Sequence, residues 1–226
     1  MFLSFIGAPG SGKGTQAHLL SQKLQIPHLS IGDLIRKEMR QASPYGQYIA
    51  RKLKNHKNLK QRKNTIHFFE TLAMELLAKR VEREDCQRGV ILDGFPRTNL
   101  QARKIKETIQ HELDGVIHIQ CEDEQILTQR VRGRLVCPAC LQIFNITFHE
   151  DHQLCSYCQT PLETRYGDKQ NIFQNRLEEY AQTTRQILPY FKAQNILFEI
   201  DGNQQIENVH KDIIHYLKLG GISLEL

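Results

Sequence analysis

The sequence lacks any long apolar run. Its longest, such as GVIL at 89–92, fall far below the roughly 20 residues that a helix needs to cross a bilayer, so no membrane span is expected. The opening MFLSFIGAPG is apolar but has no basic n-region and turns directly into a glycine-rich loop, which favours a first strand over a signal peptide. We therefore expect a cytoplasmic protein, and in that reducing setting paired cysteines suit a metal better than disulfides.

Internal repeats, low-complexity linkers and a strong excess of one charge are also missing. The 226 residues, 40% hydrophobic and 24% charged, suffice for one sizeable core with a small satellite unit. A formal net charge of +5 fits an anionic small-molecule substrate and leaves nucleic acid open. The densest basic run, residues 51–63, contains no acid. Such a run is usually a solvated helix face and loop, with steering of an anionic ligand as the alternative.

What the sequence does contain is an alternation of apolar strands with helical patterns. The predicted strands are residues 2–7, 27–29, 90–93, 115–120 and 195–201. This alternation predicts an α/β fold with a parallel sheet covered by helices on both faces. Two segments interrupt it, a helical and basic one at 30–80 and a turn-rich, cysteine-bearing one at 133–165. We expect both to be lobes inserted into a core of residues 1–29, 81–132 and 166–226.

The stretch GAPGSGKG at residues 7–14 has the spacing of a phosphate-binding loop, between a predicted strand and a predicted helix. Glycines let the backbone N–H groups approach phosphate oxygens, the helix N-terminus adds positive partial charge, and Lys13 can reach the β and γ phosphates. Gly14 follows the lysine, and a hydroxyl comes only at Thr15. We therefore expect magnesium to be held mainly by phosphate oxygens and water, with Asp93 in its outer shell.

Four of the six cysteines form two pairs. Two residues separate the members of each pair and fourteen separate the pairs, a spacing typical of a zinc site, at Cys137, Cys140, Cys155 and Cys158. Four thiolates would close the coordination sphere, which predicts a structural zinc without a catalytic water. His149 and His152 could replace a cysteine, although exposed loop histidines are the simpler interpretation. Cys86 and Cys121 lack partner spacing and are expected in the core.

The cysteine segment could be a nucleic-acid-binding zinc ribbon or a staple for a moving part of an enzyme. Residues 137–164 contain no Lys or Arg, which counts against binding of a phosphate backbone. The basic residues stand where the insert joins the core, at Arg130, Arg132, Arg134 and Arg165. Such a short segment cannot build an adequate core alone, and a structural zinc can contribute about 10 kcal/mol of folding free energy. These observations favour a metal-stapled flap with arginines at its ends.

Five segments together resemble the adenylate kinase family in order and spacing. They are GAPGSGKGTQ from residue 7, LSIGDLIR from 29, LDGFPRT from 92, RVRGRLVCPAC from 130 and NRLEEY from 175. The resemblance spans nearly the whole chain and is to the long-lid form, whose lid carries zinc in some members. It implies a P-loop nucleoside monophosphate kinase core with a five-stranded parallel sheet, a helical acceptor lobe at 30–80 and a lid at 133–165. It also implies transfer of the ATP γ-phosphoryl to AMP, giving two ADP, with magnesium.

The resemblance also implies site residues. For ATP they are Gly10, Ser11, Gly12, Lys13, Gly14, Thr15, Arg130, Arg134, Ile143, Phe144, Gly202 and Gln204. For AMP they are Ile31, Arg36, Gly94, Phe95, Pro96, Arg97, Gln101, Arg165 and Arg176. For the transfer itself they are Lys13, Asp93, Arg97, Arg134, Arg165 and Arg176. The chemistry agrees, because phosphoryl transfer needs positioning and charge stabilisation, which convergent guanidinium groups supply without a general base.

The sequence departs from the family at the acceptor side. Ile31 stands where a threonine is usual, so a polar contact to AMP is lost and an apolar wall for the base is expected. Residues 57–68 are longer than usual, with Ile66 and Phe68 as candidates to pack on the base, and Gly167 replaces one of two usual acids. AMP remains the expected acceptor because the Gln101 amide can both donate to and accept from an adenine edge. The alternatives are a CMP/UMP-type kinase, disfavoured by the long lid, and an ATP-switched zinc-ribbon nucleic-acid binder. We expect a monomer, because one chain contains both substrate sites.

Overall fold

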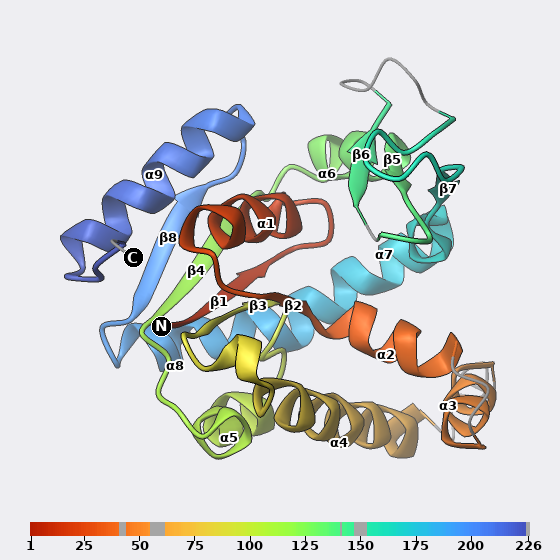
Figure 1. The fold of residues 1–226 in the computed structure, drawn as a ribbon, viewed down its shortest axis with the longest axis horizontal. Helices are drawn as coiled ribbons and strands as arrows, with labels where there is room; N and C mark the ends of the chain where they lie inside the picture. The colour runs from red at the N-terminus through yellow and green to blue at the C-terminus, as the bar shows by residue number, and fades with distance from the viewer. Residues whose placement is uncertain (41–43, 55–61, 141, 147–152, 225–226) are drawn as a thin grey trace.

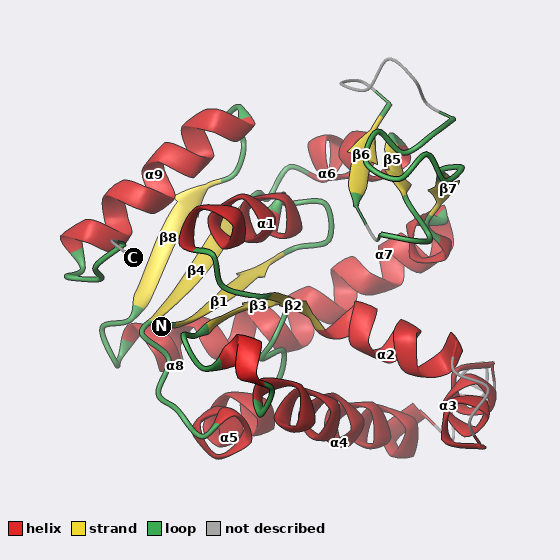
Figure 2. Ribbon diagram, viewed as in Figure 1, coloured by secondary structure: helices red, strands yellow, loops and turns green. Residues whose placement is uncertain are grey.

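A five-stranded parallel sheet forms the centre of the molecule (Figures 1 and 2). The structure is a computed structural model that describes residues 1–40, 44–54, 62–140, 142–146 and 153–224. In sheet order the strands are β2 (His28–Ser30), β3 (Val90–Asp93), β1 (Phe2–Gly7), β4 (Gly115–Gln120) and β8 (Leu197–Asp201). The α/β prediction is confirmed. Two strands differ from their predicted bounds: β2 starts and ends one residue later than predicted, and β8 starts two residues later.

The central strand β1 shows why the sheet is covered on both faces. All six of its residues are buried, as expected of a strand with no solvent-facing side. Leu3 and Phe5 join one apolar cluster, whereas Phe2 and Ile6 join another, because successive side chains of a strand point to opposite faces. Two separate apolar cores therefore form, one on each face of the sheet.

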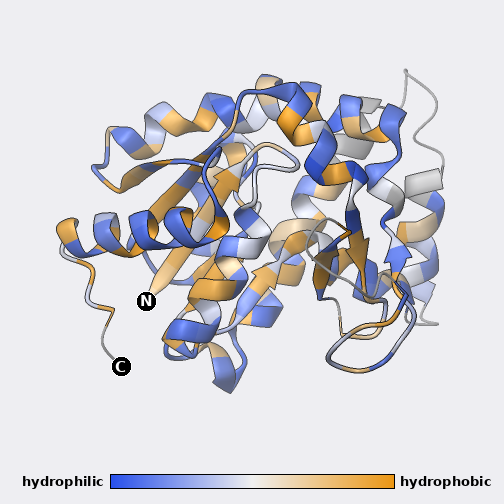
Figure 3. Ribbon diagram, turned by 90° about the horizontal axis from the view of Figure 1, so that it is seen from above, coloured by the Kyte–Doolittle hydropathy of each residue, from blue (hydrophilic) through white to orange (hydrophobic). Residues whose placement is uncertain are grey.

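Helices from distant parts of the sequence complete these cores. Side chains of α1 (Lys13–Leu24) and α9 (Ile206–Leu219) pack in the cluster of Leu3 and Phe5. The other cluster receives side chains from α4 (Arg62–Val81), α5 (Asn99–Ile109) and α8 (Leu188–Lys192). Apolar residues gather in the strands, and the outer helix faces are mostly hydrophilic (Figure 3). Among the described residues, no helix has both the length and the apolar character of a membrane span.

Two groups of elements lie beyond the carboxyl ends of the strands (Figure 1). One contains α2 (Ile31–Arg40) and α3 (Pro44–Lys54), which run from the end of β2 towards α4. The other is an antiparallel sheet of order β6-β5-β7, formed by β5 (Arg134–Val136), β6 (Ile143–Asn145) and β7 (Glu163–Thr164). It is entered from α6 (Glu124–Arg132) and left through η4 (Tyr166–Asp168) and α7 (Gln170–Glu179). The remaining turns are η3 (Glu84–Cys86), the π-helical η5 (Tyr180–Thr184) and η6 (Arg185–Ile187).

A buried imidazole in β4 makes folding stability depend on pH. His118 is 6% exposed, and burial lowers its pKa from the usual 6.5, although Glu199 opposes this shift. The unfolded chain therefore binds a proton near pH 6.5, and the folded chain binds it only at lower pH. We expect the free energy of unfolding to fall as the pH falls below 6.5, by up to about 1.4 kcal/mol per pH unit from this group.

Urea unfolding at pH 7.5, 6.5 and 5.5 measures this dependence. The H118Q variant does not titrate there, so its free energy of unfolding should decline less steeply with acid than that of the wild type. His18 and His210 also have pKa values lowered by burial, so some acid sensitivity should persist in the variant. Identical slopes for the variant and the wild type would contradict the assignment to His118.

Candidate active site

The phosphate loop follows β1 and leads directly into α1. Gly10 and Gly12 have φ angles of 88° and 97°, a left-handed conformation that glycine adopts without strain. The Ser11 N–H donates to the Ala8 carbonyl oxygen at 3.1 Å and closes the turn. The side-chain oxygen of Ser11 is buried and has no hydrogen-bond partner among the described residues. The backbone N–H groups of this loop and of the first turn of α1 thus form the place where an anion would bind.

Gly14 is packed against the carboxylate of Asp93, which explains the missing hydroxyl after Lys13. A Cβ atom at residue 14 would lie 3.1 Å from Asp93 Oδ2 and 3.7 Å from Ile143 Cδ1. A serine or threonine there would have little room. The carboxylate at the end of β3 therefore occupies the space beside the loop where a hydroxyl would otherwise stand, in keeping with its predicted place near the phosphates.

Four arginines from separate parts of the chain gather around Lys13 of this loop, namely Arg97, Arg134, Arg165 and Arg176. Desolvation and the positive charges of Arg176, Arg97 and Arg134 lower the pKa of Lys13 to about 7, despite Asp93. Burial and neighbouring arginines likewise lower the pKa values of Arg165 and Arg176 to about 10. Mutual repulsion of this kind indicates a site that is completed by a polyanionic ligand.

Asp93 and Asp168 lie within this cationic cluster, and Asp33 lies at its edge, where Arg36 adjoins Arg165. Asp168 accepts from Arg134 Nε at 2.6 Å and lies 3.7 Å from Arg176 Nη1. Asp33 accepts from Arg36 Nε at 3.1 Å. Burial alone would raise the pKa of Asp93, but the His28 imidazole, 3.4 Å away, and Lys13 outweigh burial and lower it to about 2. Asp93 is therefore ionised, and no motif in the sequence pointed to His28 as its neighbour.

A cavity of about 760 Å³ lies on one side of the loop. Every residue predicted for ATP lines it, from Gly10–Thr15 through Arg130, Arg134, Ile143 and Phe144 to Gly202 and Gln204. Arg130 Nη1 donates to the Gly202 carbonyl oxygen at 2.9 Å and so joins α6 to the end of β8. Sequence reasoning missed other lining residues, which follow the predicted ones within a few positions: Gln16, Asn145, Asn203, Gln205, Ile206, Glu207 and Val209.

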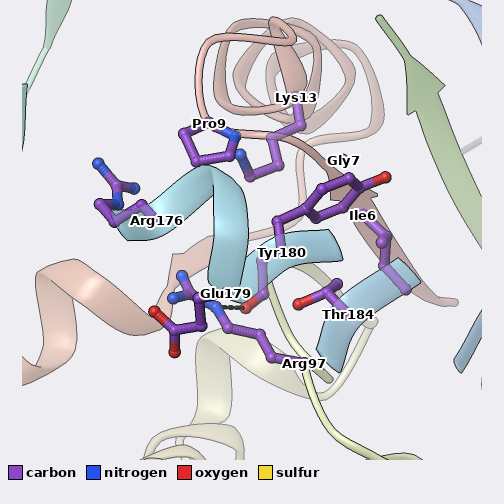
Figure 4. Close-up of a pocket in the computed structure, with 10 residues that line it drawn as sticks. Ile6, Gly7, Pro9, Lys13, Arg97, Arg176, Glu179, Tyr180 and Thr184 are labelled. Atoms are coloured by element: carbon purple, nitrogen blue, oxygen red, sulfur yellow. Dashed lines mark hydrogen bonds between the residues drawn. The ribbon is translucent and has the colours of Figure 1, made fainter. Parts of the chain in front are cut away.

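The residues predicted for AMP do not all line one cavity, unlike those predicted for ATP. A cavity of about 420 Å³ is lined by Asp33, Lys37 and Arg165, and a small one of about 40 Å³ by Gly94, Arg97 and Arg176 (Figure 4). Gln101 Oε1 already accepts from the Arg97 N–H at 2.8 Å.

Two of the predicted AMP residues pack in the apolar core. Ile31 and Phe95 are 4% and 1% exposed and pack in the apolar core. Ile31 therefore does not line these three cavities as an apolar wall for a base, because α2 starts at this residue and its side chain belongs to the core cluster that also contains Leu29 and Phe95. The side chain of Ile66 and most of the basic stretch 51–63 lie outside what the structure describes.

The four paired cysteines form one cluster. The Sγ atoms of Cys137, Cys140, Cys155 and Cys158 all lie within 4.8 Å of one another. Such spacing suits four thiolates around one tetrahedral ion with metal–sulfur distances near 2.3 Å, so the donor set fits zinc. His149 and His152 are outside the described residues. Cys86 and Cys121 are buried in apolar clusters, as predicted.

The cysteine-bearing insert rests on two other parts of the molecule. Arg40 Nη1, at the end of α2, donates to the Pro138 carbonyl oxygen at 2.8 Å. Gln142 Nε2 lies 3.2 Å from His18 Nε2 of α1. Ile143 lines both larger cavities. The insert therefore covers the phosphate loop in this structure.

A parallel sheet with a phosphate loop after its central strand and cations at its carboxyl edge defines a P-loop phosphotransferase. The sequence profile of the adenylate kinase family matches residues 5–196. The chain is 35% identical over 212 residues to "Adenylate kinase" of Methanocella arvoryzae, covering 92% of this chain and 94% of the relative. It is 33% identical over 222 residues to the protein of the same name from Caldicellulosiruptor bescii, covering 96% and 99%. The chain therefore belongs to the adenylate kinase family, as the resemblance of its motifs predicted.

Proposed function

We propose that this protein is a nucleoside monophosphate kinase that reversibly transfers the γ-phosphoryl of ATP to AMP, giving two ADP. The observation that carries the proposal is the convergence of Lys13, Arg97, Arg134, Arg165 and Arg176 on one phosphate loop, where the pKa of Lys13 falls to about 7. The transferring phosphoryl group spreads negative charge over several oxygens, and fixed cations stabilise that charge most in a site that excludes water. The names of the relatives support this assignment.

In this proposal ATP occupies the cavity of about 760 Å³. The loop from Gly10 to Thr15 holds its phosphates, Ile143 and Phe144 cover the base and sugar, and Gly202 with Gln204 lie beside the adenine. Arg130 and Arg134 hold the phosphates from the lid side. Magnesium, when bound, neutralises charge on the phosphate oxygens. Asp93, which is ionised and lies 3.4 Å from His28 Nε2, would bind water of that ion.

AMP is proposed to lie on the other side of the loop. Arg36, Arg97, Arg165 and Arg176 bind its phosphate, with Gly94, Phe95 and Pro96 shaping the turn that presents Arg97. Gln101 recognises the adenine edge through its amide, and Ile31 supports the acceptor site from the apolar core. The γ-phosphoryl group of ATP and the phosphate of AMP then meet at Lys13. Positioning replaces general-base chemistry in this step.

Residues 30–80 act as the acceptor lobe and residues 133–165 as the lid on a core of residues 1–29, 81–132 and 166–226. The lid carries a structural zinc at its four cysteines and excludes water from ATP when it closes. We further propose that the protein works as a monomer, because the residues assigned to both substrates belong to one chain. Its proposed location is the cytoplasm.

Acceptor specificity tests the proposal. ADP formation from ATP and each of AMP, GMP, CMP and UMP should give a kcat/KM at least about 10²-fold higher for AMP, because a site that hydrogen-bonds a base rejects bases with the wrong pattern. Salt-dependent binding of an oligonucleotide is measured alongside, because it is expected of a nucleic-acid binder. Equal use of the monophosphates would contradict the AMP assignment. DNA or RNA binding without ADP formation would overturn the whole proposal.

A further inference from the structure

The inference starts from a buried hydrogen bond that links the sheet to the helix behind the phosphate loop. His118 Nε2 on β4 lies 2.8 Å from the hydroxyl oxygen of Tyr180, the first residue of η5. The two residues are 62 positions apart in sequence. His118 is 6% exposed, and Tyr180 packs against apolar clusters on two sides. Leaving either polar atom without a partner at such a place would be costly, so the contact is a strong local constraint.

Neighbouring charges favour one arrangement of this hydrogen bond. Glu199 Oε1 lies 3.8 Å from the other imidazole nitrogen, His118 Nδ1, and accepts from Gln120 Nε2 at 2.7 Å. A carboxylate facing Nδ1 favours the tautomer with its proton there, which leaves Nε2 to accept from the phenol. Burial raises the pKa of Tyr180 to about 12, so the hydroxyl keeps its proton and donates. The phenol thus donates to the imidazole, while the carboxylate faces the other imidazole nitrogen at a distance beyond a direct hydrogen bond.

The phenol belongs to the same helical turn as Arg176. Tyr180 follows Arg176 by four residues, which places both on one face of α7, and its backbone N–H donates to the Arg176 carbonyl oxygen. Arg176, Tyr180 and Thr184 all line the small cavity next to Lys13 (Figure 4). A π-helical turn starts at Tyr180, and such turns often serve functional sites. The rotation of this helix therefore decides where the Arg176 guanidinium points.

The other contacts of Arg176 do not tie its helix to the sheet. Arg176 Nη1 donates to the Gly167 carbonyl oxygen at 3.3 Å and lies 3.7 Å from Asp168, both in the segment that leads out of the lid. A segment attached to the lid shifts when the lid moves. The link from Tyr180 to His118 joins the same helix to β4, a buried strand beside the phosphate-loop strand β1.

We propose that His118 is a positioning residue for phosphoryl transfer: through Tyr180 it sets the rotation of α7 and so aims Arg176 at the phosphate held by Lys13. His118 itself touches neither substrate. The inference rests on the proposed function, because it takes Arg176 to stabilise the transferring group. It assigns a role to a sheet residue that none of the motifs contains.

Kinetic measurements on H118L and Y180F test the proposal. Each variant removes one side of the hydrogen bond and should lower kcat about tenfold, since a small misplacement of a charged group is costly in the transition state. The KM for ATP should change less than twofold, because Tyr180 does not line the large cavity. H118Q should retain most of the activity, because the end of a glutamine side chain reaches the position of Nε2. H118N is too short and should behave like H118L.

Two controls separate positioning from simple destabilisation. Q120L removes another side chain that contacts Glu199 from the same strand, and its kcat should equal that of the wild type. In an R176A background, H118L should lower kcat by less than twofold further, since residues that act through one another are not additive. Its effect on melting temperature should be the same in both backgrounds. Y180F keeps the test open if H118L does not fold.

The possible failures point to different errors. An unchanged kcat in folded Y180F and H118L, or the same tenfold loss in the R176A background, would overturn the role of His118. An unchanged kcat in R176A would instead contradict the proposed function, and the role of His118 with it. If R176A loses activity and H118Q does not retain it, the imidazole does more than accept a hydrogen bond. That result would also overturn the proposal as stated.

Discussion

Replacing Lys13 with methionine is expected to lower kcat by about 10² to 10³-fold in a protein that still folds, because a fixed charge that meets the developing negative charge in the transition state is lost. Methionine keeps most of the apolar stem, and Lys13 Nζ donates to the Ala8 carbonyl oxygen at 3.1 Å, a neutral acceptor at the start of the loop. Removing a desolvated cation from among Arg97, Arg134 and Arg176 relieves repulsion, so stability should hold or rise. Steady-state formation of ADP gives kcat, and circular dichroism checks the fold.

The matched control for this prediction is K23M. Lys23 is exposed in the last turn of the same helix, far along α1 from the phosphate loop. Its loss should leave kcat within a factor of two of the wild type. A K13M protein that turns over at a third of the wild-type rate or faster would contradict the role assigned to Lys13.

Replacing both Cys137 and Cys140 with serine is expected to unfold the lid while leaving the core folded. Among the described residues of the cysteine insert, the buried apolar side chains are Leu135, Cys137 and Cys155, so the bound metal, worth about 10 kcal/mol, is expected to be the main source of its stability. Metal analysis should find one zinc per wild-type chain and none in the variant. The variant should melt at lower temperature and be cleaved within residues 133–165 by protease, with part of its activity retained.

The A139S variant is the control for the cysteine substitutions. Ala139 is exposed between the two replaced cysteines, so its change to serine should leave zinc content, melting temperature and activity as in the wild type. Complete loss of turnover in a folded double variant would argue that the metal takes part in the chemistry. An unchanged melting temperature would contradict the structural role.

The strands could be predicted because the sheet is parallel and covered on both faces, so each strand is a short apolar run between helical patterns. β1, β3 and β4 agree with their predicted ranges. The boundaries of β2 and β8 depend on pairing, since His28 lies opposite Ile91 and Leu197 opposite Val116. No local pattern marks where such an edge strand begins.

The candidate site also contains residues that could be predicted from the sequence and residues that could not. Residues of the ATP cavity were predictable because they stand in short motifs at the ends of elements, as Lys13 and Gly202 do. Ile31 could be located by its motif, but its direction into the core follows from where α2 starts against β2 and β3. His28 carries no sequence signal at all, and its contact with Asp93 arises only because β2 pairs with β3.

The phosphate loop, the metal-binding spacing of the cysteines and the alternating α/β order can be read from the sequence, because each depends on residues close together in the chain. Which charges meet depends instead on how the chain folds. Arg134 and Asp168 are 34 positions apart, and His118 and Tyr180 are 62 apart, so their contacts exist only once the sheet and the helices behind it have packed. Packing also desolvates the cations at the loop, and the lowered pKa of Lys13 follows from that burial, because an isolated lysine near water keeps its ordinary value.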